Sequence, residues 1–171
     1  MILSSLYLEI FIGLLLAIFF GAVLGIERNL AGKMAGMRTY ALVSLGSALF
    51  VSISRLVLAS VQSPMLNADP LRLASQVVVG IGFIGAGLVV FRGSELTGIT
   101  TAAGVWVSAA VGMACGFGLY ALALFATGLT LFIFTIMWSI ERDYIKARLV
   151  DNLCVPGGGK KGEEDSDSVY D

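Results

Sequence analysis

Five long apolar stretches, each nearly free of charged residues, constrain this chain more than any other feature. They run over residues 10–26, 40 to about 60, 73–91, 98–115 and 119–140. A helix needs about 20 mostly apolar residues to cross a bilayer. The runs are continuous rather than alternating, which argues against a membrane β-barrel. The pattern therefore predicts an all-α polytopic membrane helix bundle of about five transmembrane helices.

The composition agrees with that fold class and argues against several classes of function. Hydrophobic residues make up 57% of the 171 residues and charged residues only 13%, whereas soluble domains carry about 25% charged residues. This balance argues against a soluble enzyme and against a nucleic-acid partner. The chain has no histidine, so no His-based metal site is expected, and its two cysteines predict no disulfide framework.

The basic residues predict the orientation of the bundle. All of the eleven Lys and Arg except Arg55 and Arg72 fall in the connectors 27–39 and 92–97 or after residue 140. Basic residues gather on the cytoplasmic side, so we expect the N-terminus outside and the C-terminus in the cytoplasm. We expect a transmembrane domain over 1–140, a cytoplasmic helical extension over 141–153 and a disordered charged tail over 154–171.

Small residues recur every fourth position in two of the spans. The first span carries Gly13, Ala17, Gly21 and Gly25, and the fourth carries Thr100, Gly104, Ser108, Gly112 and Gly116. Residues four apart share one helix face, and small faces let helices approach closely in lipid. We interpret these faces as helix packing rather than a pore lining. The third and fourth spans are expected at the centre of the bundle. The fifth is expected to face lipid through Leu122, Leu124, Phe125, Leu131, Phe132 and Phe134.

The third span contains a glycine run that matches the pattern GxGxxG. The run comprises Gly80, Gly82, Gly85 and Gly87. A dinucleotide fingerprint would need a strand before it and a helix with a polar face after it, and the chain lacks both. Two membrane interpretations remain. The glycines form a packing groove for a neighbouring helix, or they break the helix and expose backbone carbonyls, as in transporters.

A weak repeat relates the start of the second span to the start of the fourth. Gly36-Met-Arg-Thr39 opens one and Gly98-Ile-Thr-Thr101 opens the other, and both threonines are expected at N-cap positions. The repeat predicts two similar helix hairpins.

Charged and polar residues near the membrane are candidates for a functional site. On the expected inner side these are Glu27, Arg28, Arg38, Thr39, Thr100 and Thr101, and on the outer side Asp69, Arg72 and Gln76. Flanking charge and helix capping are the ordinary alternatives. No metal site is assigned, but Mg²⁺ binds through one or two carboxylates and several waters, which Asp69 or Glu27 could supply.

Several segments together resemble the MgtC/SapB family of bacterial membrane proteins. They are Gly25-Ile-Glu27-Arg28, Ala35-Gly36-Met37-Arg38-Thr39, Leu42–Gly46, Asp69-Pro-Leu-Arg72 through Val78, Gly80–Gly87, and Gly98–Ala103 with Trp106. The family pattern has proline where this chain has Met34, which leaves the turn before the second span less fixed. The resemblance implies a multi-pass protein of the bacterial inner membrane that is linked to magnesium limitation. Longer members carry a cytoplasmic ACT-like domain after the membrane part.

Two functions fit these observations. The first is a non-enzymatic regulator or accessory subunit, which would contact lipid and other membrane proteins or a second copy of itself. The alternative is a transporter or channel for Mg²⁺ or another ion. No cofactor is expected beyond Mg²⁺ as a ligand or substrate. An intramembrane enzyme is not supported, because no nucleophile–base pair is evident.

Overall fold

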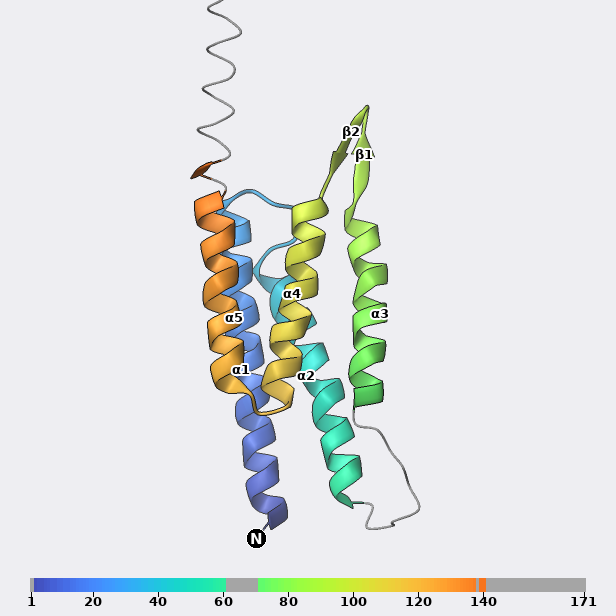
Figure 1. The fold of residues 1–171 in the computed structure, drawn as a ribbon, viewed down its shortest axis with the longest axis vertical. Helices are drawn as coiled ribbons and strands as arrows, with labels where there is room; N and C mark the ends of the chain where they lie inside the picture. Colours follow the sequence, from blue (N-terminus) through green and yellow to red (C-terminus); the bar gives the residue numbers. More distant parts are fainter. Residues whose placement is uncertain (1, 61–70, 138, 141–171) are drawn as a thin grey trace, which may run out of the picture. The chain divides into compact units, whose positions relative to one another are not determined.

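A computed structural model describes residues 2–60, 71–137, 139 and 140. The chain divides into two compact units, residues 1–135 and 136–171. The five α-helices and one β-hairpin lie in the first unit (Figure 1). The expected helical extension 141–153 and the tail 154–171 lie outside the described residues.

The predicted all-α bundle of five helices is confirmed. Its elements are α1 (Ile2–Leu30), α2 (Met37–Ser60), α3 (Leu71–Leu88), β1 (Val90–Arg92), β2 (Glu95–Thr97), α4 (Ile99–Gly116), α5 (Tyr120–Phe132) and a π-helical turn η1 (Ile133–Met137). Within the described residues, four segments are long and apolar enough to cross a membrane: Ser5–Leu30, Met37–Ala59, Ile99–Gly116 and Tyr120–Met137. The apolar part of α3, Arg72–Leu88, is shorter. The expected inside and outside ends stay a prediction.

The third predicted span ends earlier than expected. α3 stops at Leu88, and Val90–Arg92 pairs antiparallel with Glu95–Thr97 instead. Hydropathy does not separate a short strand from the end of an apolar helix, so this small hairpin was missed. Gly93 turns the hairpin at φ +65°. Gly98 leads out of it at φ +93°, where a Cβ would collide with the carbonyl of Leu88.

The small faces of α1 and α4 lie against α2. A Cβ at Gly21 would be 2.7 Å from the carbonyl oxygen of Tyr40, and one at Gly25 would collide with the backbone of Met37. On α4, a Cβ at Gly112 would collide with the carbonyl of Ser44. These glycines therefore let helix backbones approach without side chains between them.

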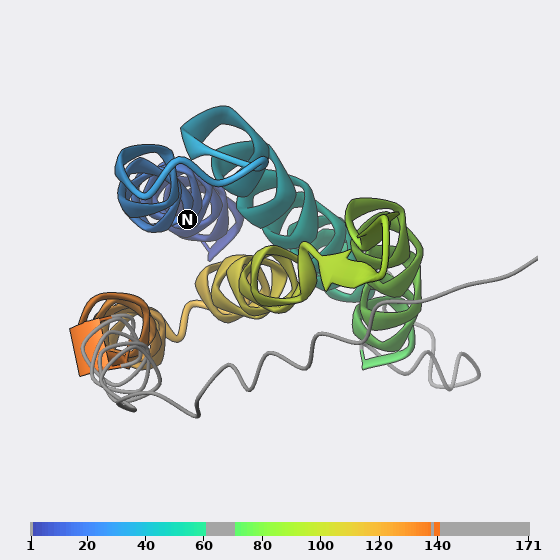
Figure 2. The ribbon, with the colours of Figure 1, turned by 90° about the horizontal axis from the view of Figure 1, so that it is seen from above.

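α4 lies at the centre of the bundle, as expected, but α3 does not. Seen from above, α4 lies between α5 on one side and α3 on the other, with α1 and α2 beside it (Figure 2). Half of α4 is buried, whereas Ile81 is the buried hydrophobic side chain that α3 contributes. The expectation that the third span is central is therefore wrong, because its small residues do not form a face that another helix covers.

α3 is a continuous helix from Leu71 to Leu88. It passes through Gly80, Gly82, Gly85 and Gly87 without a break. The broken-helix interpretation is therefore wrong, since the backbone carbonyls of this run stay inside a regular helix.

Candidate functional site

A buried arginine lies at the end of α1 that is expected to face the cytoplasm. Arg28 is only 2% exposed, and its guanidinium pairs with the carboxylate of the neighbouring Glu27. The ring of Phe134, from the end of α5, lies 3.6 Å from the guanidinium carbon. A buried charge is costly unless it is paired. Here a carboxylate balances the charge and the face of an aromatic ring attracts it.

Tyr40 and α4 complete this site. The Tyr40 hydroxyl donates to the carbonyl of Thr101 at 3.3 Å, and the Ser108 hydroxyl donates to the carbonyl of Tyr40 at 2.9 Å. Gly104 leaves the necessary space, because a Cβ there would lie 2.7 Å from the Cζ atom of Phe134 and would collide with the Tyr40 hydroxyl.

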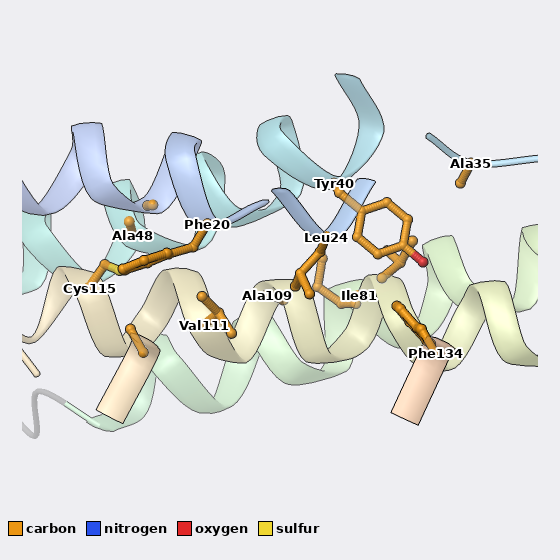
Figure 3. Close-up of a cluster of buried hydrophobic side chains, with 13 residues drawn as sticks. Phe20, Leu24, Ala35, Tyr40, Ala48, Ile81, Ala109, Val111, Cys115 and Phe134 are labelled. Carbon is orange, nitrogen blue, oxygen red and sulfur yellow. The ribbon is translucent and has the colours of Figure 1, made fainter. Parts of the chain in front are cut away.

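Four helices thus meet at one cluster, which we call the Arg28 cluster: Glu27, Arg28, Tyr40, Thr101, Gly104 and Phe134. In Figure 3, Tyr40 and Phe134 lie together at one end of the row of buried side chains along α4. A buried ion pair at the end of a membrane helix bundle is a candidate functional site.

The structure separates the predicted inner residues into two groups. Glu27, Arg28 and Thr101 belong to the Arg28 cluster, while Thr100 is exposed on α4. Arg38 and Thr39 instead line a shallow pocket with Asn29 at the start of α2.

The predicted N-cap roles of the two threonines are wrong. Each is the third residue of its helix, α2 or α4, and Gly98 occupies the N-cap position of α4 without a side-chain cap. A glycine at that place is required by its positive φ, which a threonine would rarely adopt.

The predicted outer residues do not join the Arg28 cluster. Arg72 and Gln76 are exposed in the first turns of α3, and α3 starts at the end of the bundle opposite the last turn of α1 (Figure 1). Gln76 lines a groove between α2 and α3. Asp69 lies outside the described residues.

Two members of the cluster were not found from the sequence, and Gly104 was identified only as a packing residue. Tyr40 looks like an ordinary span residue, and the expectation that Phe134 faces lipid is wrong. The sequence feature that could have revealed Phe134 is periodicity. The inward residues of α5 are Ala123, Thr127 and Thr130, and Phe134 in the following turn η1 continues the helical spacing of three and four.

A second charged pair at the other end was also missed. Arg55 on α2 donates from Nη2 to Oε1 of Glu9 on α1 at 2.9 Å, and from Nη1 to the carbonyl of Gly116 at 2.9 Å. The Tyr120 hydroxyl donates to the carbonyl of Glu9 at 2.8 Å. The sequence feature that could have revealed this pair is the presence of opposite charges, Glu9 and Arg55, in or beside two apolar spans.

The two charged sites lie at the two ends of the apolar part of α1. Glu9 and Arg28 are separated along one helix by roughly 28 Å at 1.5 Å per residue, close to the hydrocarbon thickness of a bilayer, about 30 Å. No group of three or more His, Cys, Asp or Glu side chains that could hold a metal occurs in the part of the chain that the structure describes. Glu27, one of the two carboxylates that could supply an Mg²⁺ ligand, pairs with Arg28, and its role as a ligand stays a prediction.

Comparison with known proteins identifies the family. The model of the MgtC family matches residues 14–143. The chain belongs to the MgtC family. With its apolar helices, it is a multi-pass membrane protein of this family.

Several curated relatives are similar to the chain. It is 44% identical over 126 residues to "Putative magnesium transporter YhiD" of Escherichia coli (strain K12), covering 73% of this chain and 59% of that protein. It is 43% identical over 111 residues to "Protein MgtC" of Brucella abortus (strain 2308), covering 65% of this chain and 44% of that protein. "Protein MgtC" of Salmonella typhimurium (strain LT2) is 43% identical over 116 residues, covering 68% of this chain and 47% of that protein. The chain thus spans about half the length of these relatives. No solved structure matches the chain.

Proposed function

We propose that this protein is a non-enzymatic regulator or accessory subunit of other membrane complexes in the bacterial inner membrane, active under magnesium limitation. Membership of the MgtC family and the printed name of YhiD support the link to magnesium. The observation that carries the regulatory role is an open glycine pair on α3, Gly80 and Gly87, which are seven residues apart and share one helix face.

The glycines of α3 differ from those of α1 and α4. A Cβ added at Gly80, Gly82 or Gly87 would meet nothing within 4 Å, and one at Gly85 would make an ordinary 3.7 Å contact with Ala102. Glycine lowers the stability of a helix interior by about 1 kcal/mol relative to alanine. A second helix that packs closely on the face of Gly80 and Gly87 would offset that cost. The predicted packing role of these four glycines therefore stays a prediction, for a partner outside this chain.

A groove beside the same face adds polar contacts. It encloses about 510 Å³ between α2 and α3, and Gly46, Ser47, Gln76 and Gly80 are among its lining residues. A side-chain amide in the hydrocarbon region is stabilised by hydrogen bonds to another helix. The groove therefore suits a transmembrane helix with a small, partly polar face.

The test is replacement of Gly80 by leucine in cells grown at limiting magnesium. We expect Gly80→Leu to abolish the crosslinking of this protein to its partner and the growth that depends on it. Gly128→Leu on α5 is the matched control, because Gly128 is also exposed with nothing within 4 Å of an added Cβ. Equal behaviour of the two variants would contradict the proposal. Gly21→Leu and Gly112→Leu do not serve here, since both glycines lie against α2.

Transport of Mg²⁺ is the second candidate function, and the name of YhiD favours it. Its test is Mg²⁺ flux into liposomes that contain only this protein, with Glu27→Gln and Asp69→Asn beside it. Flux that is lost in these variants would establish transport. Absence of flux in folded, inserted protein would leave the regulatory proposal standing.

A further inference from the structure

We propose that Phe134 is a positioning residue for the Arg28–Glu27 pair: its ring covers Arg28 against water and couples the π-helical turn after α5 to the pair. This inference does not depend on whether the protein regulates or transports. It rests on the geometry of the Arg28 cluster and on the side-chain pattern of α5.

The side chains of α5 that face the bundle are small. Ala123, Thr127 and Thr130 are buried, and the hydroxyls of both threonines donate to carbonyls within the helix. The next inward position is Phe134, at 7% exposure, whereas Phe132 two residues earlier is 56% exposed. Small inward residues bring α5 close to the bundle, so the one large aromatic side chain in this row reaches over Arg28.

The groups around the Phe134 ring match both its size and its attraction to a cation. The guanidinium lies under the ring at 3.6 Å, and the bare backbone of Gly104 receives the Cζ end of the ring. Glu27 neutralises the arginine from one side, and the negative face of the ring stabilises the cation from the other. An aliphatic side chain of similar size would fill the space without that attraction.

This arrangement links the end of α5 to the buried charge. Phe134 belongs to the π-helical turn Ile133–Met137, and π-helical turns occur often at functional sites. Displacing this turn would withdraw the ring and leave Arg28 without its cover. Movement of this turn would therefore be transmitted to the Arg28–Glu27 pair.

Cysteine accessibility in liposomes tests the proposal. Thr101 is buried in the cluster, so a Thr101→Cys substitution in full-length protein that also carries Cys154→Ser places a thiol there. The labelling of that thiol by a membrane-impermeant maleimide is timed. Buried Cys115 near the far end of α4 reports whether the fold is intact. We expect Phe134→Leu to raise the labelling rate of the introduced thiol at least tenfold, and the control Phe132→Leu to change it less than twofold.

A second background separates attraction to the charge from simple space filling. In Glu27→Gln/Arg28→Met protein, which lacks both charges, Phe134→Leu should change the labelling rate less than twofold. An equal increase in both backgrounds, or no increase in either, would overturn the proposal. If Phe134→Leu also exposes Cys115, the uncharged background should restore its protection. Failure to do so would likewise overturn it. Because the readout needs neither Mg²⁺ nor a partner protein, it is independent of the proposed function.

Discussion

Arg55 of α2 holds Glu9 of α1 at 2.9 Å and binds the carbonyl of Gly116 on α4 with its other terminal nitrogen. One side chain thereby ties together three helices at the end opposite the Arg28 cluster. Tyr120 adds α5 through its bond to the carbonyl of Glu9. These bonds make the pair a structural clamp in a region where helices gain little from apolar attraction.

Replacing Arg55 by leucine should weaken the bundle. The change removes two charge-assisted hydrogen bonds and leaves Glu9 unpaired, so we expect the free energy of unfolding to fall by about 1–3 kcal/mol. Arg72→Leu, at an exposed position on α3, should change it by less than about 0.5 kcal/mol. Reversible unfolding in mixed detergent micelles measures both, and similar values for the two would refute the clamp.

Adding one methyl group at Gly112 should be far more damaging than adding it at Gly82. The Gly112 methyl would meet the backbone of Ser44, whereas the Gly82 methyl would meet open space. We expect Gly112→Ala to lower stability by about 1–3 kcal/mol or more. Gly82→Ala should be neutral or stabilising by up to about 1 kcal/mol. Thermal unfolding in the same detergent distinguishes the two, and the prediction fails if both are tolerated.

Two glycines of the hairpin region should respond differently to asparagine, the residue that best tolerates positive φ. Gly93 has φ +65° with open space around it, so Gly93→Asn should cost less than about 1 kcal/mol. At Gly98 the added Cβ would collide with the carbonyl of Leu88. Gly98→Asn should therefore cost about 1–3 kcal/mol and raise hydrogen exchange in the first turn of α4. Unchanged hydrogen exchange in the first turn of α4 would contradict this prediction for Gly98→Asn.

The Tyr40 hydroxyl should contribute measurably to the Arg28 cluster. Tyr40→Phe removes the hydrogen bond to the carbonyl of Thr101, so we expect a loss of about 0.5–1.5 kcal/mol. Tyr7→Phe, at an exposed position on α1, is the control and should have no measurable effect. Equilibrium unfolding measures the difference in stability. A Tyr40→Phe protein as stable as the control would show that this hydrogen bond does not contribute to the free energy of unfolding.

Much of the fold could be predicted from local pattern alone. Five helices follow from the apolar runs, and close packing of the small faces of α1 and α4 follows from small residues at a spacing of four, although their partner α2 does not. The hairpin Val90–Thr97 could not be predicted, because a three-residue strand has no periodicity to detect. Of the candidate site, Glu27, Arg28 and Thr101 were identified because charged and polar residues at a helix end are rare and costly in an apolar chain.

The sequence by itself determined how many helices form, where the second, third and fourth begin and end to within three residues, and which ends carry charge, because these depend on hydropathy and on spacing within one helix. Only the tertiary structure decided which glycines lie against a neighbouring helix. Gly112 lies against α2 and Gly82 lies open, although both look alike in sequence. It also decided that Phe134 covers Arg28 and that Arg55 finds Glu9. Such pairings depend on how each helix is rotated against its neighbours, and that rotation is set by the packing of the whole bundle rather than by any one span.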